Sequence, residues 1–291
     1  MYPTPYSDLF PRLESPAEAA RYQLTAAQLD AYRENGFVGG IPILAEAECA
    51  VLVERLDWLV RHARELEDRL YEIELAWAER PGDVAFHCLG GWLVDEALHD
   101  VLFHPAVTVP AAQCIGVQRL RLWHDQIFAK PPHHPGVVPW HQDWSYWQRL
   151  TPPRHVTVHI ALDDADEENG CIHYVPGSHR WEAFDRVPFG GDMDALPEAL
   201  PAHLRQQFQP VPCRLRRGEG VLHHSHIVHG SYENRSDRPR RALALNFMAP
   251  DTRVADDSAP LLKGVPPIAA GEIVEGDHFP IVLDLLGVGE E

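Results

Sequence analysis

A histidine and an aspartate two residues apart form the strongest chemical signal in the chain. His141 and Asp143 flank Gln142, and alternate residues of an extended strand point to the same face. An imidazole nitrogen and a carboxylate oxygen that meet there can bind a divalent metal ion, but a third ligand must come from elsewhere. Two histidines and one carboxylate form the facial triad of non-haem Fe(II) oxygenases, which leaves coordination positions open. A later histidine-rich segment offers His223, His224, His226 and His229 as the third ligand.

Spacing alone supports this metal site only weakly. The chain has 18 histidines, and a histidine two residues from an aspartate is common by chance. The ordinary interpretation is a histidine at the surface or the edge of the core near an acidic neighbour. The aromatic residues beside the pair also have two interpretations, because Trp144, Tyr146 and Trp147 can fill the core or form the wall of a substrate pocket.

The first third of the chain, which must support this site, has a helical pattern. Thr25 and Gln28 form a capping box ahead of a helix that stops at Gly36. A second and longer helical pattern runs from about residue 45 to 77, and Pro81-Gly82 ends it.

From about residue 118 the pattern changes to that of strands. Short segments rich in Val, Ile and aromatic residues alternate with Pro, Gly, Asp and Asn, which favours a sandwich or jelly roll. Residues 130–139 and 179–217 are predicted as loops, and no regular structure is predicted for the last forty or so residues. We therefore expect a mainly β protein with N-terminal helices.

Composition narrows the class of protein. The 291 residues suggest one large domain, and the formal net charge of −18 argues against binding to a nucleic acid or an anionic membrane surface. The five cysteines include no CxxC pair, so neither a disulfide framework nor a thiolate zinc site is expected. No secretory signal and no apolar run of roughly 18 residues is evident, and the predicted location is the cytoplasm. The sequence does not indicate whether the protein is a monomer or an oligomer.

Three segments resemble, in their order and spacing along the chain, the phytanoyl-CoA dioxygenase (PhyH-like) family of Fe(II)/2-oxoglutarate oxygenases. The resemblance covers roughly residues 118 to 250 and includes the helical entry LTAAQLDAYRENGFV. It implies a double-stranded β-helix, a jelly roll of the cupin type, with Fe(II) as the metal and 2-oxoglutarate and O₂ as cosubstrates. The segments that carry it are WHQDWSYW, IALDDADEENGCIHYVPGSHRW and HGSYENRSDRPRRALALNF.

The resemblance assigns roles to individual residues. His141 and Asp143 match the first two metal ligands, and His229 matches the third. Arg240 matches the arginine that binds the far carboxylate of 2-oxoglutarate, and Ser231 matches a hydroxyl that helps to hold it. A guanidinium is the natural bidentate partner of a carboxylate, and strand alternation allows only one of Arg240 and its neighbour Arg241 to face inward. His223, His224 and His226 are expected to be strand residues without a direct role.

Two further positions are predicted to contact the cosubstrate. Gln126 lies about where family members hold such a side chain. His159 stands where the human prototype of the family has a tryptophan, so it either hydrogen-bonds the cosubstrate or packs as an ordinary buried histidine.

The expected protein is therefore a single PhyH-like domain over residues 1–291. It would divide into a helical part at about 1–115, a jelly-roll core at about 116–250 and a C-terminal extension at 251–291. Its expected reaction is hydroxylation of an unactivated C–H bond in a small molecule, a metabolite or natural-product intermediate. Arg214, Arg216 and Arg217 offer only a weak basic patch for a coenzyme A ester. The alternatives are a cupin-type metal-dependent hydrolase or isomerase that does not use 2-oxoglutarate, and a non-catalytic binding protein.

Overall fold

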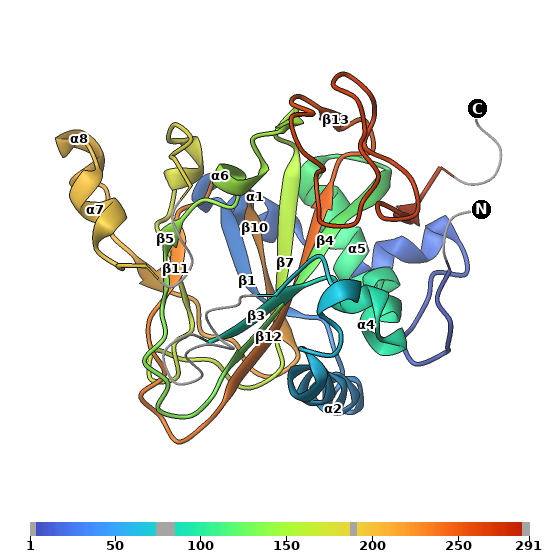
Figure 1. Cartoon of the computed structure of the whole chain (residues 1–291), viewed down its shortest axis with the longest axis horizontal. Helices are drawn as coiled ribbons and strands as arrows, with labels where there is room; N and C mark the ends of the chain where they lie inside the picture. The colour runs from blue at the N-terminus through green and yellow to red at the C-terminus, as the bar shows by residue number, and fades with distance from the viewer. Residues whose placement is uncertain (1–3, 74–84, 187–190, 287–291) are drawn as a thin grey trace.

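Two antiparallel sheets of unequal size form the body of the protein (Figure 1). The computed structural model describes residues 4–73, 85–186 and 191–286. The strands are β1 (Phe37–Pro42), β2 (Glu72–Ile73), β3 (Phe86–Leu89), β4 (Arg119–Lys130), β5 (Val138–His141), β6 (Leu150–Thr151), β7 (His155–Ala161), β8 (Ile172–Tyr174), β9 (Val211–Pro212), β10 (Glu219–His224), β11 (His229–Ser231), β12 (Arg240–Met248), β13 (Arg253–Val254) and β14 (Ile281–Asp284). The α-helices are α1 (Ala26–Asn35), α2 (Glu46–His62), α4 (Glu96–Asp100), α5 (Pro105–Ile115), α6 (Trp144–Trp147), α7 (Ala195–Ala199) and α8 (Ala202–Arg205).

The chain alternates between the two sheets as it runs through the core. The larger sheet has the order β1-β10-β7-β12-β4-β3-β2, with β14 also paired to β4, and the smaller has the order β5-β11-β8-β9. From β4 to β12, successive strands of the core therefore lie in the larger sheet, then the smaller, then the larger again. This winding is a double-stranded β-helix, so the predicted mainly β jelly roll is confirmed.

Residues at the two ends of helix α1 determine where it begins and where it stops. The side-chain oxygen of Thr25 accepts a hydrogen bond from the backbone N–H of Gln28, and the Gln28 side chain accepts one from the backbone N–H of Thr25. Gly36 ends the helix with φ of 84°, a left-handed conformation that glycine adopts at little cost. The predicted capping box and stop are confirmed.

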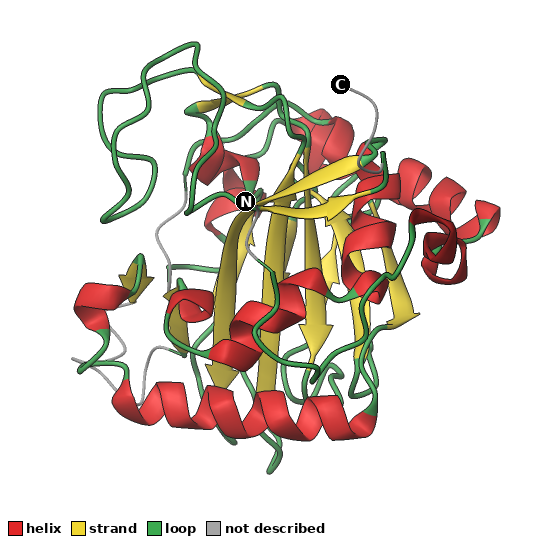
Figure 2. Ribbon diagram, turned by 90° about the vertical axis from the view of Figure 1, so that its right-hand side faces the viewer, coloured by secondary structure: helices red, strands yellow, loops and turns green. Residues whose placement is uncertain are grey.

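The second predicted helix is shorter than its pattern suggested. Helix α2 ends at His62, and the chain forms a 3₁₀ turn (Glu67–Arg69) before β2 pairs with β3. Leucines on its inner face are fully buried, and α2 runs across the direction of the strands (Figure 2). Pairing of β2 to the sheet takes precedence over helical propensity beyond this point. Pro81-Gly82, predicted to end the helix, lies outside the described residues.

Segments expected to lie outside the jelly roll also join its larger sheet. The part expected to be helical, about residues 1–115, supplies β1, β2 and β3, and the extension expected without regular structure supplies β14. The predicted loop at 130–139 ends in β5, which begins at Val138, and the predicted loop at 179–217 contains α7 and α8. These strands are short and paired with partners far away in sequence, which a local pattern does not reveal.

Candidate active site

A cavity of about 640 Å³ lies between the two sheets. Residues from β3, β4, β7, β10 and β12 of the larger sheet and from β5, β8 and β11 of the smaller one line it, together with α6 and the loop at 260–263. Its volume falls in the range of small-molecule sites. All seven residues predicted as ligands or cosubstrate contacts line this cavity: Gln126, His141, Asp143, His159, His229, Ser231 and Arg240.

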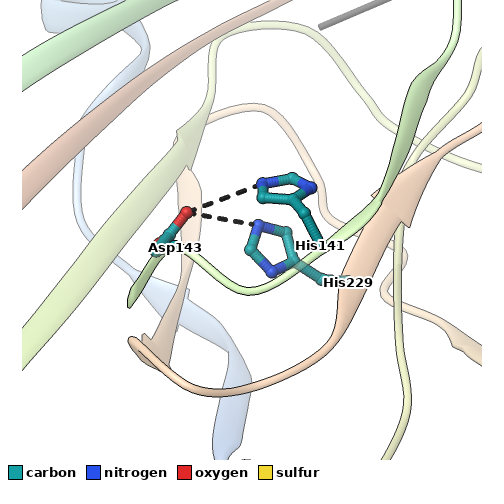
Figure 3. Close-up of side chains that lie close together, drawn as sticks. All are labelled: His141, Asp143 and His229. Carbon is teal, nitrogen blue, oxygen red and sulfur yellow. Dashed lines mark ion pairs between the residues drawn. The ribbon is translucent and has the colours of Figure 1, made fainter. Parts of the chain in front are cut away.

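The predicted metal ligands converge at one end of the cavity (Figure 3). His141 and His229 are directly paired residues of β5 and β11, so the pairing of these strands brings their imidazoles together. Oδ1 of Asp143 lies 3.6 Å from Nε2 of His141 and 3.7 Å from Nε2 of His229. One possible ligand atom from each residue lies within 4.8 Å of the other two. This donor set fits a divalent metal with open coordination positions.

The position of Asp143 corrects one step of the prediction. Strand β5 ends at His141, and Asp143 has helical angles (φ −54°, ψ −38°) as the residue that precedes α6. Its carboxylate therefore reaches the histidines through a turn and not through strand alternation. The two-residue spacing was informative, but the geometry behind it differs.

Both imidazoles of the triad are held in the orientation that a metal requires. Nδ1 of His141 lies 2.7 Å from the carbonyl oxygen of Pro139, and Nδ1 of His229 lies 3.0 Å from that of Ile227. A carbonyl oxygen only accepts, so each Nδ1 carries a proton, and Nε2 is the ring atom that could bind a metal beside Asp143. Burial first, and His141 second, lower the pKa of His229 well below its ordinary value.

The other oxygen of the Asp143 carboxylate is bound by the protein. Oδ2 accepts hydrogen bonds from Nε2 of His223 at 3.0 Å and from the hydroxyl of Thr157 at 2.8 Å. Nδ1 of His223 in turn lies 2.9 Å from the Tyr174 hydroxyl. Burial alone would raise the pKa of Asp143, but His229, His141 and His223 outweigh it and hold that pKa well below its usual value. His223 was expected to be a strand residue without a direct role; it lies in β10, and its contact with Oδ2 can orient the Asp143 carboxylate.

Arg240 and Arg241 face opposite sides of β12. The Arg240 side chain is 3% exposed and lines the cavity, where Nη2 lies 3.4 Å from Nε2 of His159. Arg241 instead forms ion pairs with Asp163 at 2.7 Å and Asp57 at 2.9 Å. Within the described part of the chain, Arg240 has no carboxylate partner. A buried guanidinium without one is a ready site for a carboxylate ligand.

Ser231 and Lys130 lie beside this arginine. Lys130 pairs with Arg240 across β4 and β12, and its buried ammonium donates to the hydroxyl oxygen of Ser231 at 2.9 Å and to the carbonyl of Tyr232. The Ser231 hydroxyl donates to the carbonyl of Gly170 at 2.8 Å, so it must turn away from Gly170 to donate to a ligand. Burial first, and Arg240 second, lower the pKa of Lys130 well below its ordinary value. No motif or spacing in the sequence marks Lys130 as a site residue.

The two remaining predicted contacts also face the cavity. His159 is 5% exposed, and burial followed by the charge of Arg240 lowers its pKa well below the ordinary value. Gln126 accepts a hydrogen bond from Asn246 at 3.3 Å, and its Nε2 lies 3.4 Å from Nε2 of His87. His87 lines the same cavity, although no motif in the sequence marks it as a site residue.

Some aromatic residues near the triad form the cavity wall, and another packs in the core, so each of the two interpretations holds for part of the group. Tyr146 and Trp147 line the cavity, whereas Trp144 stacks on His226 at a centroid distance of 5.4 Å. The Tyr146 ring lies 5.7 Å from that of His141, so the wall begins immediately beside the metal ligands.

The fold and the site together define a jelly-roll enzyme of the facial-triad metal class. The sequence pattern of the family "Phytanoyl-CoA dioxygenase (PhyH)" matches residues 32–242. The chain therefore belongs to the phytanoyl-CoA dioxygenase family of oxygenases. Of the described residues, no helix is long and apolar enough to span a membrane.

Individual relatives agree with this assignment. Bovine phytanoyl-CoA dioxygenase domain-containing protein 1 is 29% identical over 264 residues, which cover 77% of this chain and 90% of the relative. The non-haem α-ketoglutarate-dependent carbocyclase SnoK from nogalamycin biosynthesis is 26% identical, with a TM-score of 0.70 over 89% of this chain and 96% of that one. The epimerase SnoN, solved with Fe³⁺, α-ketoglutarate and nogalamycin RO, shares the fold at 22% identity, with a TM-score of 0.71 over 92% of this chain and 100% of that one.

Proposed function

We propose that the chain is an Fe(II)- and 2-oxoglutarate-dependent dioxygenase that hydroxylates an unactivated C–H bond of a small molecule. One observation carries the proposal: an open His-Asp-His triad and a buried arginine without a carboxylate partner line the same cavity. The triad suits a metal with free positions, and the arginine suits the far carboxylate of a dicarboxylate cosubstrate. Iron with 2-oxoglutarate and O₂ supplies the oxidation itself.

The protein's own contribution is to bind and orient. Nε2 of His141 and His229 and Oδ1 of Asp143 would hold the metal on one face, and the buried walls exclude water. Thr157 reaches Asp143, and His159, two residues further along β7, reaches Arg240. These same-face positions of one strand are separated by roughly 7 Å. A cosubstrate anchored at Arg240 can therefore extend along β7 toward the metal.

Two features favour hydroxylation, desaturation or ring closure over halogenation and over chemistry without 2-oxoglutarate. Related halogenases lack the carboxylate ligand, which makes room for chloride, whereas Asp143 is present here and fixed by two hydrogen bonds. A metal-dependent hydrolase or isomerase, the alternative function, has no use for a buried arginine without a carboxylate partner at the far side of the cavity.

The direct test is release of succinate from 2-oxoglutarate by protein reconstituted with Fe(II) without air and then exposed to O₂. We expect release that depends on both iron and Arg240. Turnover of an ester or an isomerisable sugar phosphate with Zn²⁺, and no succinate with Fe(II), would favour the alternative.

A further inference from the structure

Four cationic side chains line the cavity: Arg149, Arg186, Arg240 and Lys263. None of them forms an ion pair within the described part of the chain, although acidic residues outnumber basic ones by 43 to 25. Elsewhere in that part, eleven arginines are ion-paired, and seven others that do not line the cavity also lack an ion pair. Four cations without an ion pair thus line one cavity, and this concentration of positive charge favours the binding of anions there.

Three of these cations are more exposed than Arg240, since Arg186 and Lys263 are exposed and Arg149 is partly buried. Arg149 follows α6 and Arg186 lies over the Tyr146 ring of that helix, with Cζ 5.1 Å from the ring centroid. The Arg149 guanidinium donates to the carbonyls of Pro260 and Leu261, which fixes the loop that carries Lys263. We call Arg149, Arg186 and Lys263 the mouth cations.

Arg149 and Lys263 donate to neutral acceptors and Arg186 lies over an aromatic ring, so within the described residues no ion pair cancels their charge. Arg149 binds backbone carbonyls, and Lys263 donates to the carbonyl of Glu67 at 3.2 Å. Two carboxylates line the cavity, and one of them, Asp143, belongs to the metal site. The other, Glu72, is exposed, so among the described residues that line the cavity the three mouth cations meet one carboxylate outside the metal site.

Much of the remaining cavity wall is apolar. Trp123 and Trp147 are buried, and neighbouring aromatic and leucine side chains continue the surface. A ligand that fills this space therefore needs an apolar body as well as a charged end. The wall residues are Tyr71, Leu89, Trp123, Phe128, Tyr146, Trp147, Leu261 and Leu262.

We propose that the primary substrate is an organic anion with an apolar body, such as a carboxylic acid, whose charged group binds at the mouth cations. This inference rests on the proposed function, because it names the substrate class of the same site. The basic cluster predicted from sequence does not serve this purpose. Arg214 and Arg217 are ion-paired with Glu167 and Glu46 and do not line the cavity.

The test compares three carboxylates with their amides, which have the same shape without the charge. The probes are naphthalene-2-carboxylate, 4-phenylbutanoate and decanoate, measured by calorimetry on the iron-loaded protein without air, at low salt and with saturating 2-oxoglutarate to occupy Arg240. We expect at least one carboxylate to bind about tenfold more tightly than its amide, since three exposed ion pairs each contribute a few-fold. In Arg186→Gln/Lys263→Gln the preference should fall below about threefold.

The matched control is Arg216→Gln, which removes an exposed cation that does not line the cavity and should keep the preference. Equal binding of acid and amide, a preference that survives in the double variant, or no binding by any carboxylate overturns the proposal. Absence of iron-dependent succinate release would instead overturn the proposed function, because probe binding is measured without turnover.

Discussion

Oδ2 of Asp143 lies 3.0 Å from Nε2 of His223, while Oδ1 of the same carboxylate faces the two other triad residues. The two oxygens thus have separate tasks. Oδ2 also accepts a hydrogen bond from the Thr157 hydroxyl. Because two protein groups already bind Oδ2, Oδ1 is the oxygen left for a metal. Such outer contacts fix the geometry of a ligand and commonly matter almost as much as the ligand itself.

Loss of the His223 contact should weaken metal binding without changing a ligand. His223→Leu is expected to lower Fe(II) affinity by about 10- to 100-fold, the usual effect of removing an outer partner. His223→Gln should recover part of it, because its amide N–H can still donate to Oδ2. Anaerobic Fe(II) titration measures both variants. Equal affinity in His223→Leu and wild type would show that the contact does not orient Asp143.

The role of His229 as the third metal ligand can be tested by comparison with a neighbouring histidine. His229→Ala should abolish 2-oxoglutarate turnover and leave the fold intact, because it removes one of three metal ligands. His226→Ala should keep substantial turnover, since His226 is partly buried and stacks on Trp144 outside the cavity. Succinate release and circular dichroism report the two properties. An active His229→Ala beside an inactive His226→Ala would mean that the ligand is misassigned.

Removal of the carboxylate should change the metal site in a specific way. Asp143→Gly would leave a coordination position that chloride can fill, and hydroxylation should fall sharply. The variant also removes one negative charge that stabilises the higher oxidation states of iron. Product analysis by mass spectrometry, with and without chloride, measures the outcome. Hydroxylation at the wild-type rate would contradict the assignment of Asp143 as a ligand.

Arg240 and Arg241 form a matched pair for testing the cosubstrate site. Truncation of one partner of a buried charged pair costs about 2–5 kcal/mol, or roughly 30- to 4000-fold in affinity. Arg240→Ala should therefore raise the 2-oxoglutarate requirement by at least an order of magnitude, with little change in Fe(II) affinity. Arg241→Ala, which loses ion pairs on the opposite face, should change it only a few-fold.

A 2-oxoglutarate titration beside an anaerobic iron titration measures both arginine variants. A raised requirement in Arg241→Ala with none in Arg240→Ala would reverse the assignment. An unchanged requirement in both would remove the carboxylate site and with it the main support for this cosubstrate.

The sequence alone determined the features that local rules encode. Thr25, Gln28 and Gly36 predicted both ends of α1, because capping depends on residues within one turn of each other. Strand alternation predicted that only one of Arg240 and Arg241 faces inward, and the resemblance to the oxygenase family selected Arg240 and, among the histidines, His229 as the third ligand beside His141 and Asp143. Composition also placed the strands of the core after residue 118, where β-branched and aromatic residues are concentrated.

Only the tertiary structure decided which distant residues meet. His223 is 80 residues from Asp143 in the chain, and their contact exists because β10 pairs with β7 and so faces the turn that holds Asp143. Lys130 reaches Ser231 across 101 residues, and the mouth cations come from three separate segments. Helix α2 ends at His62, and the chain turns before Glu72 and Ile73 pair with β3. Strand pairing and side-chain packing join residues that no local spacing relates, so these contacts could be found only in the folded chain.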